Sequence, residues 1–192
     1  MLYGATKLRW APIVEEPAGA LPTYGQAREL GELNRLSDNP TYNEAKAYGN
    51  NALRRHVNKF KEVPIDVTIL DISNENASAI TGAAIAEEAG QDLVFGVNDN
   101  APYGGLSFYV NELLEGNVDA FKGIYYPKAK ANMQGQEYTT MGENITLAAK
   151  TLRFLGAAAN NGQWKVESKY FTTEAEADAW AAAKLAGEEA GA

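Results

Sequence analysis

Residues Asp92–Lys130 read DLVFGVNDNAPYGGLSFYVNELLEGNVDAFKGIYYPKAK, and this stretch predicts an antiparallel meander of three strands. In the first two strands apolar side chains recur at every second position, which is typical of strands with one buried face, and the third is rich in aromatic residues. Turn-forming residues separate the strands. Pro127 cannot donate a backbone hydrogen bond, so we expect the third strand to end there or to continue at a sheet edge. The three strands are expected over 93–97, 106–110 and 118–126.

The segment before this meander predicts one more strand and a helix. Glu62–Ile72 alternates apolar and polar residues, as a half-buried strand does. Ser73 follows in the position of a helix N-cap, with Glu75 in the first turn. Gly82 is either a kink or the residue that ends this helix. Its apolar stripe is expected to consist of Ala77, Ile80, Ala84 and Ile85.

The two ends of the chain supply the remaining elements. Leu2–Val14 predicts an extended first strand or arm, and Arg28–Leu36 is too short and too interrupted by Gly31 for a helix, so we expect a second strand there. Trp164–Tyr170 alternates and predicts the last strand. Residues Thr173–Glu176 form a capping box that opens an alanine-rich helix. The expected docking face of this helix is Ala177, Trp180 and Ala181.

Together these elements predict a single domain over residues 1–192, of mainly β (α+β) class. We expect two packed antiparallel sheets that form a sandwich or barrel, with one central helix and a short C-terminal helix over 173–186. An extended N-terminal segment, 1–14, and a long loop, 37–61, complete the domain.

The composition disfavours several classes of function. The 192 residues include 17 basic and 25 acidic side chains, and the formal charge of −8 disfavours binding to nucleic acid through its phosphates. Without cysteine, neither disulfides nor thiolate metal sites can stabilise the fold. No apolar run approaches the roughly 20 residues of a membrane span, and MLYGATKLRW lacks the apolar core of a signal peptide. We therefore expect a soluble protein that is not secreted by the general pathway, with no cofactor, no membrane partner and no specific nucleic-acid binding.

One segment has charge of the opposite sign. Ser37–Lys61 is polar, and it predicts a loop with too few large apolar side chains to become ordered by itself. Within it, Lys46–Lys61 contains five basic residues and no acidic one, so the rest of the chain, with 12 basic and 25 acidic residues, has a charge of −13. The residues alone leave two interpretations open, a solvated basic face and a contact with an acidic neighbouring subunit.

Signals for catalysis or ligand binding are weak. His56 is the only histidine, and its neighbour Arg55 would disfavour a bound cation, so we expect no metal or catalytic role. Carboxylates such as Asp66 and Asp71 would have to converge for glycoside chemistry, and solvated turn residues are the simpler interpretation. A monomeric β-sandwich carbohydrate-binding module and a small hydrolase remain as alternative functions. Tyrosines for a sugar-binding platform, or equally for a subunit interface, are Tyr103, Tyr109, Tyr125 and Tyr126.

Five segments, taken in order, resemble a known family. They are MLYGATKLRWAPI (1–13), TYGQARELGEL (23–33), APYGGLSFYV (101–110), FKGIYYPKAKANMQGQEYTTMGENITL (121–147) and NGQWKV (161–166). As an ordered set they resemble the major tail protein family of long-tailed bacteriophages, the tail-tube protein of siphophages. The specificity comes from the set, since no single motif is diagnostic.

This resemblance implies a structural virion protein without catalytic activity. Copies of the chain would form rings, hexameric in this family, that stack into a hollow tail tube through which phage DNA passes to the host. The implied partners are further copies of the chain, the tape measure protein in the lumen, the tail terminator and the distal tail protein, with DNA only in transit. The implied location is the virion, after assembly in the cytoplasm of the bacterial host. The resemblance favours a subunit contact for the basic segment, with candidate interface residues Tyr42, Lys46, Tyr48, Asn50, Arg54, Arg55, Lys59 and Lys61.

Overall fold

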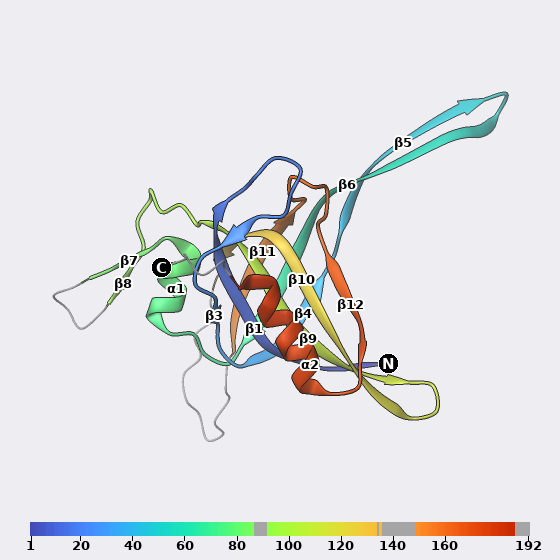
Figure 1. Cartoon of the computed structure of the whole chain (residues 1–192). Helices are drawn as coiled ribbons and strands as arrows, with labels where there is room; N and C mark the ends of the chain where they lie inside the picture. The colour runs from blue at the N-terminus through green and yellow to red at the C-terminus, as the bar shows by residue number, and fades with distance from the viewer. Residues whose placement is uncertain (87–91, 134, 136–148, 187–192) are drawn as a thin grey trace, which may run out of the picture.

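The structure, a computed structural model of the whole chain, describes residues 1–86, 92–133, 135 and 149–186 (Figure 1). It confirms the predicted mainly β (α+β) class. Neither helix of the described chain is long and apolar enough to cross a membrane. In chain order the elements are β1 (Leu2–Glu15), β2 (Thr23–Tyr24), β3 (Arg28–Glu29), β4 (Leu33–Asp38), β5 (Thr41–Gly49), β6 (Ala52–Ile69), α1 (Asn74–Thr81), β7 (Ala84–Ile85), β8 (Leu93–Val94), β9 (Tyr103–Leu114), β10 (Val118–Met133), β11 (Lys150–Ala157), β12 (Val166–Phe171) and α2 (Glu174–Leu185).

Ten of the strands form one antiparallel sheet, in which β2, β1, β9, β10, β11, β6 and β4 are neighbours in that order. β12 pairs with β10, β3 with β1 and β5 with β6, and β7 and β8 form a separate two-stranded sheet. The large sheet curls so that its two ends meet. β1 lies near one end of the strand order and β4 at the other, and β3, which pairs with β1, is connected to β4 by residues 30–32 alone. Between them Leu30 donates its N–H to the Leu8 carbonyl at 2.9 Å. The result is a barrel-like sheet (Figure 1).

The main core fills the inside of this curled sheet, and a second cluster lies on its outer face. There α2 covers β9 and β10, with Leu185 against Tyr24 and Tyr125. For this reason Ser107 and Tyr109 are as buried as their inward-facing neighbours, and the expectation of a half-buried strand is wrong for β9. The inner core includes Leu8, Trp10, Leu30, Val63, Ile65, Val67, Ile69, Ile80, Leu106, Phe108, Val110, Leu152 and Phe154.

Two strands of the predicted meander are confirmed as the hairpin β9–β10, which turns at Gly116 and Asn117. The prediction that 93–97 is the first strand of this meander is wrong. Only Leu93–Val94 forms a strand, β8, and it pairs with β7 in the small sheet. A tight turn ends it. The Asp99 carboxylate accepts the N–H of Gly96 at 2.7 Å, and the Asp99 N–H donates to the Gly96 carbonyl at 3.2 Å.

β10 continues through Pro127 to Met133, so the prediction of a strand end or an edge there is wrong. Along one edge, β10 pairs with β12 as far as Tyr125 and with β11 from Lys128 onward. Pro127, which has no N–H to donate, therefore lies between these two pairings, where neither strand needs a hydrogen bond from it. The register against β9 also shifts here, between Tyr126 and Ala129. A bulge accommodates the proline inside the sheet.

The predicted central helix is confirmed as α1, but it is shorter than expected. The Ser73 hydroxyl accepts the N–H of Asn76 at 3.2 Å, as an N-cap does, and the helix ends at Gly82, whose φ is 76°. The expected continuation of its apolar stripe to Ala84 and Ile85 is wrong, because these residues form β7.

The C-terminal helix is confirmed as α2, and it docks on the outer face of the sheet. Its N-cap Thr173 accepts the N–H of Glu176 at 3.4 Å. The Trp180 ring lies over Gly123 of β10 so closely that a Cβ at position 123 would be 2.2 Å from the ring. Asp178 forms ion pairs with Lys7 and Arg9 of β1, at 2.7 and 2.6 Å. The fully buried side chains of α2 are Ala177, Ala181 and Leu185.

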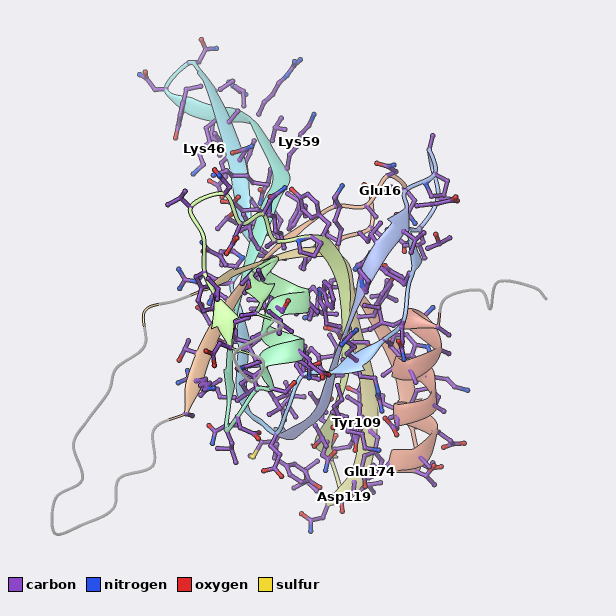
Figure 2. All side chains as sticks on the ribbon, turned by 90° about the vertical axis from the view of Figure 1, so that its left-hand side faces the viewer. Glu16, Lys46, Lys59, Tyr109, Asp119 and Glu174 are labelled. Carbon is purple, nitrogen blue, oxygen red and sulfur yellow. The ribbon has the colours of Figure 1, made fainter. Side chains whose placement is uncertain are left out.

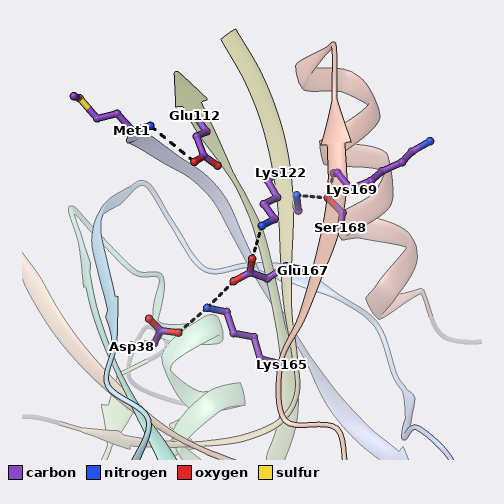
Figure 3. Close-up of polar contacts among 9 residues, drawn as sticks. Met1, Asp38, Glu112, Lys122, Lys165, Glu167, Ser168 and Lys169 are labelled. Atoms are coloured by element: carbon purple, nitrogen blue, oxygen red, sulfur yellow. Dashed lines mark hydrogen bonds and ion pairs between the residues drawn. The ribbon is translucent and has the colours of Figure 1, made fainter. Parts of the chain in front are cut away.

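A row of side chains with alternating charge links β12 to β4 and β10 through ion pairs (Figure 3). Lys165 lies 2.8 Å from Asp38 of β4 and 3.1 Å from Glu167 of β12. Glu167 also pairs with Lys122 of β10. Burial alone would raise the pKa of Asp38, but the hydrogen bonds from Lys165 and Tyr126 outweigh it and lower this pKa below its usual value.

The segment 37–61 is not a loop, and that prediction is wrong. Its residues form the end of β4, all of β5 and the first part of β6, so β6 begins well before the predicted Glu62. Pairing between β5 and β6 satisfies the backbone polar groups along their shared edge, which a loop would leave to water. The predicted N-terminal segment, 1–14, is the inner strand β1, and the predicted strand over 28–36 is divided into β3 and β4.

A projecting basic ribbon as candidate assembly surface

A two-stranded ribbon, Thr41–Glu62, projects from the barrel (Figure 1). It consists of β5 and the first part of β6, and within the described chain these two stretches pair only with each other. From Val63 onward β6 joins the barrel between β11 and β4. The nine residues of β5 correspond to about 30 Å at about 3.4 Å per residue. The ribbon is therefore a long arm with two unpaired edges.

The tip of the ribbon is a two-residue turn. Asn50 and Asn51 both have positive φ, 52° and 59°, between the paired residues Gly49 and Ala52. Two successive left-handed residues are typical of a type I′ turn, whose twist matches that of the strands, and asparagine tolerates this conformation. Arg54 donates from Nε to the Gly49 carbonyl at 3.0 Å. An Asn-Asn pair is a weaker hairpin signal than Asn-Gly, so the sequence did not reveal the turn.

An aromatic stack joins the base of the ribbon to the barrel. Phe60 lies flat on Trp164, with ring centroids 4.7 Å apart and planes at 8°, and Tyr42 meets Phe60 edge-on at 6.2 Å. Phe60 and Trp164 also pack against the inner core. The Thr41 hydroxyl donates to the Glu62 carbonyl at 3.0 Å. These contacts hold the ribbon in one direction relative to the barrel.

The ribbon is basic on an acidic protein. It has five Lys and Arg residues against Glu44 and Glu62, a formal charge of +3, which leaves −11 on the rest of the chain from 12 basic and 23 acidic residues. The Glu44 carboxylate already has partners within the ribbon, since Lys46 lies 3.3 Å and His56 3.6 Å from it. The hydrogen bond from Lys46 lowers the pKa of Glu44.

Three cations of the ribbon have no such partner. Within the part of the chain that the structure describes, no carboxylate lies within 4 Å of Arg54, Arg55 or Lys59. Figure 2 shows Lys46 and Lys59 on the ribbon, clear of the barrel. Cations that are left free within the subunit are available to an anionic group from outside.

Large apolar side chains are also exposed on the ribbon. Tyr48, Leu53 and Val57 are 70%, 51% and 48% exposed. Tyr48 and Leu53 face each other beside the turn, and Val57 faces Ala45 further down the ribbon. An ordered element that keeps apolar side chains exposed among cations is typical of a surface that another macromolecule covers.

All eight predicted interface residues lie on this ribbon, in three settings. Tyr42 and Lys61 belong to its base, where Lys61 pairs with Glu62 at 3.2 Å, and Asn50 belongs to the turn. The other five, which project along the strands, are Lys46, Tyr48, Arg54, Arg55 and Lys59. Leu53 and Val57 were not among the predicted interface residues, because a segment predicted to be a loop has no regular face on which apolar side chains would gather.

Comparison with known proteins gives no assignment, since no family model and no curated protein matches the chain. The resemblance of the five ordered segments to tail-tube proteins therefore has no support from these comparisons. The barrel, the ribbon and the distribution of charge are the basis for inferring function.

The four tyrosines of the possible sugar-binding platform do not share one exposed surface. Tyr109, Tyr125 and Tyr126 are buried, so three of the four rings are not available to a sugar at the surface of the subunit. The fourth, Tyr103, has the ammonium groups of Lys128 and Lys130 at 4.8 and 5.5 Å from its ring centroid. In the described ranges no group of three or more His, Cys, Asp or Glu side chains is arranged to hold a metal ion.

Proposed function

We propose that this chain is a structural subunit that polymerises with copies of itself, as a major tail protein of a long-tailed bacteriophage. The ribbon supports the proposal most strongly. It is an ordered arm whose charge is opposite to that of the remaining chain, and its apolar side chains are uncovered within the described structure. The barrel provides the rigid body from which the arm projects, and the resemblance of five ordered segments supports the identity of the polymer.

The charge of the ribbon favours a head-to-tail contact. A twofold dimer that pairs one ribbon with another would bring two surfaces of charge +3 together. A ribbon that meets a different, acidic surface of its neighbour forms a heterologous contact instead, and such contacts generate rings or open filaments. This is the kind of contact that stacked rings need.

In the proposed tube, rings of six copies stack around a channel through which DNA passes. The net charge of −8 has the same sign as that of DNA, so a wall with acidic side chains toward the lumen would repel the passing DNA. The further partners in this proposal are the tape measure protein, the tail terminator and the distal tail protein. The proposed location is the virion, after assembly in the host cytoplasm.

Microscopy of the purified protein with a matched variant tests the proposal. In the variant, Lys46–His56 is replaced by Asn-Gly, because Ala45 and Val57 face each other across the ribbon and a two-residue turn can join them. We expect the wild type to form filaments with an axial channel in negative stain. The variant should remain a folded monomer by circular dichroism and light scattering.

Wild-type protein that stays a compact monomer over a wide concentration range would contradict the proposed function. Filaments formed equally well by the shortened variant would show that the ribbon is not the interface. Glu115→Gln in the β9–β10 turn serves as a control that changes an exposed charge away from the ribbon.

A further inference from the structure

We propose that the ribbon of one copy docks on an acidic surface at the far end of β6 in a second copy. This far-end surface consists of Glu29, Glu32, Asp71 and Glu75. The inference rests on the proposed function, because it names the surface through which self-assembly would proceed. It follows from charge complementarity, since the +3 ribbon requires a surface of opposite sign on an identical chain.

Backbone contacts bring the far-end surface together from three parts of the chain. Leu70, the residue after β6, donates its N–H to the Glu32 carbonyl at 2.9 Å. The side-chain amide of Asn76 in α1 donates to the Glu29 carbonyl at 2.7 Å. The β3–β4 turn is thus held beside Asp71, which lies between β6 and α1, and beside Glu75 in the first turn of α1.

The four carboxylates of the far-end surface are exposed, and none belongs to an ion pair within the described residues. A second acidic region, at the β9–β10 turn, also lies opposite the ribbon, as Asp119 shows in Figure 2. There, however, Glu112 lies 3.8 Å from the N-terminal amine and Asp119 accepts a hydrogen bond from Tyr3 at 2.7 Å. The far-end surface therefore has the less compensated charge, and we assign the ribbon to it.

The ribbon and the far-end surface lie at opposite ends of one strand. β6 runs from Ala52, beside the turn of the ribbon, to Ile69, beside the far-end surface. Its 18 residues span up to roughly 60 Å at about 3.4 Å per residue. A contact between these two ends repeats in one direction, so copies would be added along β6.

Charge reversal on each surface tests this docking. One variant contains Arg54→Glu and Arg55→Glu, which change the charge of the ribbon from +3 to −1. The other contains Glu29→Lys, Glu32→Lys, Asp71→Lys and Glu75→Lys, which change the charge of the far-end surface from −4 to +4. In each variant alone the two surfaces have more similar charge, so we expect the sedimentable fraction to fall about tenfold or more. An equimolar mixture of the two variants should assemble again, because each ribbon then finds a far-end surface of opposite charge. A single chain with all six substitutions should also assemble.

The outcomes separate this inference from the proposed function. Normal assembly of the far-end variant, or a mixture that stays unassembled, would overturn the docking surface. Filaments of the wild type would still leave the proposed function intact. Wild-type protein that never assembles would overturn both. Glu115→Lys with Asp119→Lys should assemble normally, and loss of assembly there would move the contact to the β9–β10 turn. Binding to duplex DNA is the alternative role of the ribbon. If the wild type retained DNA, the R54E/R55E variant did not, and both charge-reversal variants assembled normally, the ribbon would be a nucleic-acid surface and the inference would be overturned.

Discussion

Replacing Trp164 with alanine tests whether the aromatic stack fixes the ribbon to the barrel. A fully buried tryptophan changed to alanine costs about 3–5 kcal/mol, and because Trp164 is half-buried we expect a loss of about 2 kcal/mol in the free energy of unfolding. About 1 kcal/mol of this loss comes from stacking on Phe60 at 4.7 Å. For a chain of this length, 2 kcal/mol corresponds to a decrease in Tm of about 4–8 °C.

Thermal denaturation followed by circular dichroism measures the loss of stability, and amide hydrogen exchange over Thr41–Glu62 reports on the ribbon. We expect Trp164→Ala to accelerate exchange in the ribbon more than in β9, since the inner strands keep their own contacts. Trp164→Phe keeps a ring against Phe60 and should retain most of the stability. An unchanged Tm together with unchanged exchange in the ribbon would refute the anchoring role of the stack.

Three further predictions concern single side chains. Tyr48→Ser should change stability by less than about 0.5 kcal/mol but slow filament growth measured by light scattering, and unchanged growth would remove Tyr48 from the interface. The hydrogen bond from Lys122 lowers the pKa of Glu167, so its stabilisation is present above the ordinary glutamate pKa of about 4.3 and is lost as pH falls through the lower folded value. Tm measured from neutral to acidic pH should then fall more steeply for the wild type than for Glu167→Gln, and parallel curves would contradict this. Gly123→Ala should displace the Trp180 ring, with a cost of about 1–3 kcal/mol and a shifted tryptophan emission spectrum, whereas an unchanged spectrum would show that α2 docks differently.

Elements with one buried face or a defined cap were predictable from the sequence. The alternation in 62–69 follows from packing one face of β6 against the inner core. In β9 the apolar residues Leu106, Phe108 and Val110 face the same core, although α2 also covers the other face of that strand. Ser73 and Thr173 were identifiable as caps because a hydroxyl before a helix accepts a free N–H of its first turn. The basic character of 46–61 was also predictable, since it depends only on a local excess of Lys and Arg.

The ribbon itself was not predictable, because neither of its faces is buried along most of its length. Without burial the sequence has no need for apolar residues at every second position, and the polar composition of 41–51 then resembles that of a loop. The contacts that place the ribbon join distant parts of the chain. No local signal indicates that Phe60 stacks on Trp164, or that Leu30 closes the sheet against Leu8.

An ordered ribbon changes the energetics of assembly relative to the loop that the sequence suggested. A mobile segment of this length would lose about 1–2 kcal/mol of conformational entropy for each residue that becomes fixed on docking. In the ribbon the β5–β6 pairing, the turn at Asn50 and Asn51 and the stack of Phe60 on Trp164 provide that order before any neighbour arrives. Docking then has to immobilise only exposed side chains, at about 0.5–1.5 kcal/mol each. The preorganised ribbon also has a positive charge, which attracts an acidic surface and repels a second ribbon. This charge favours head-to-tail growth over the pairing of two ribbons.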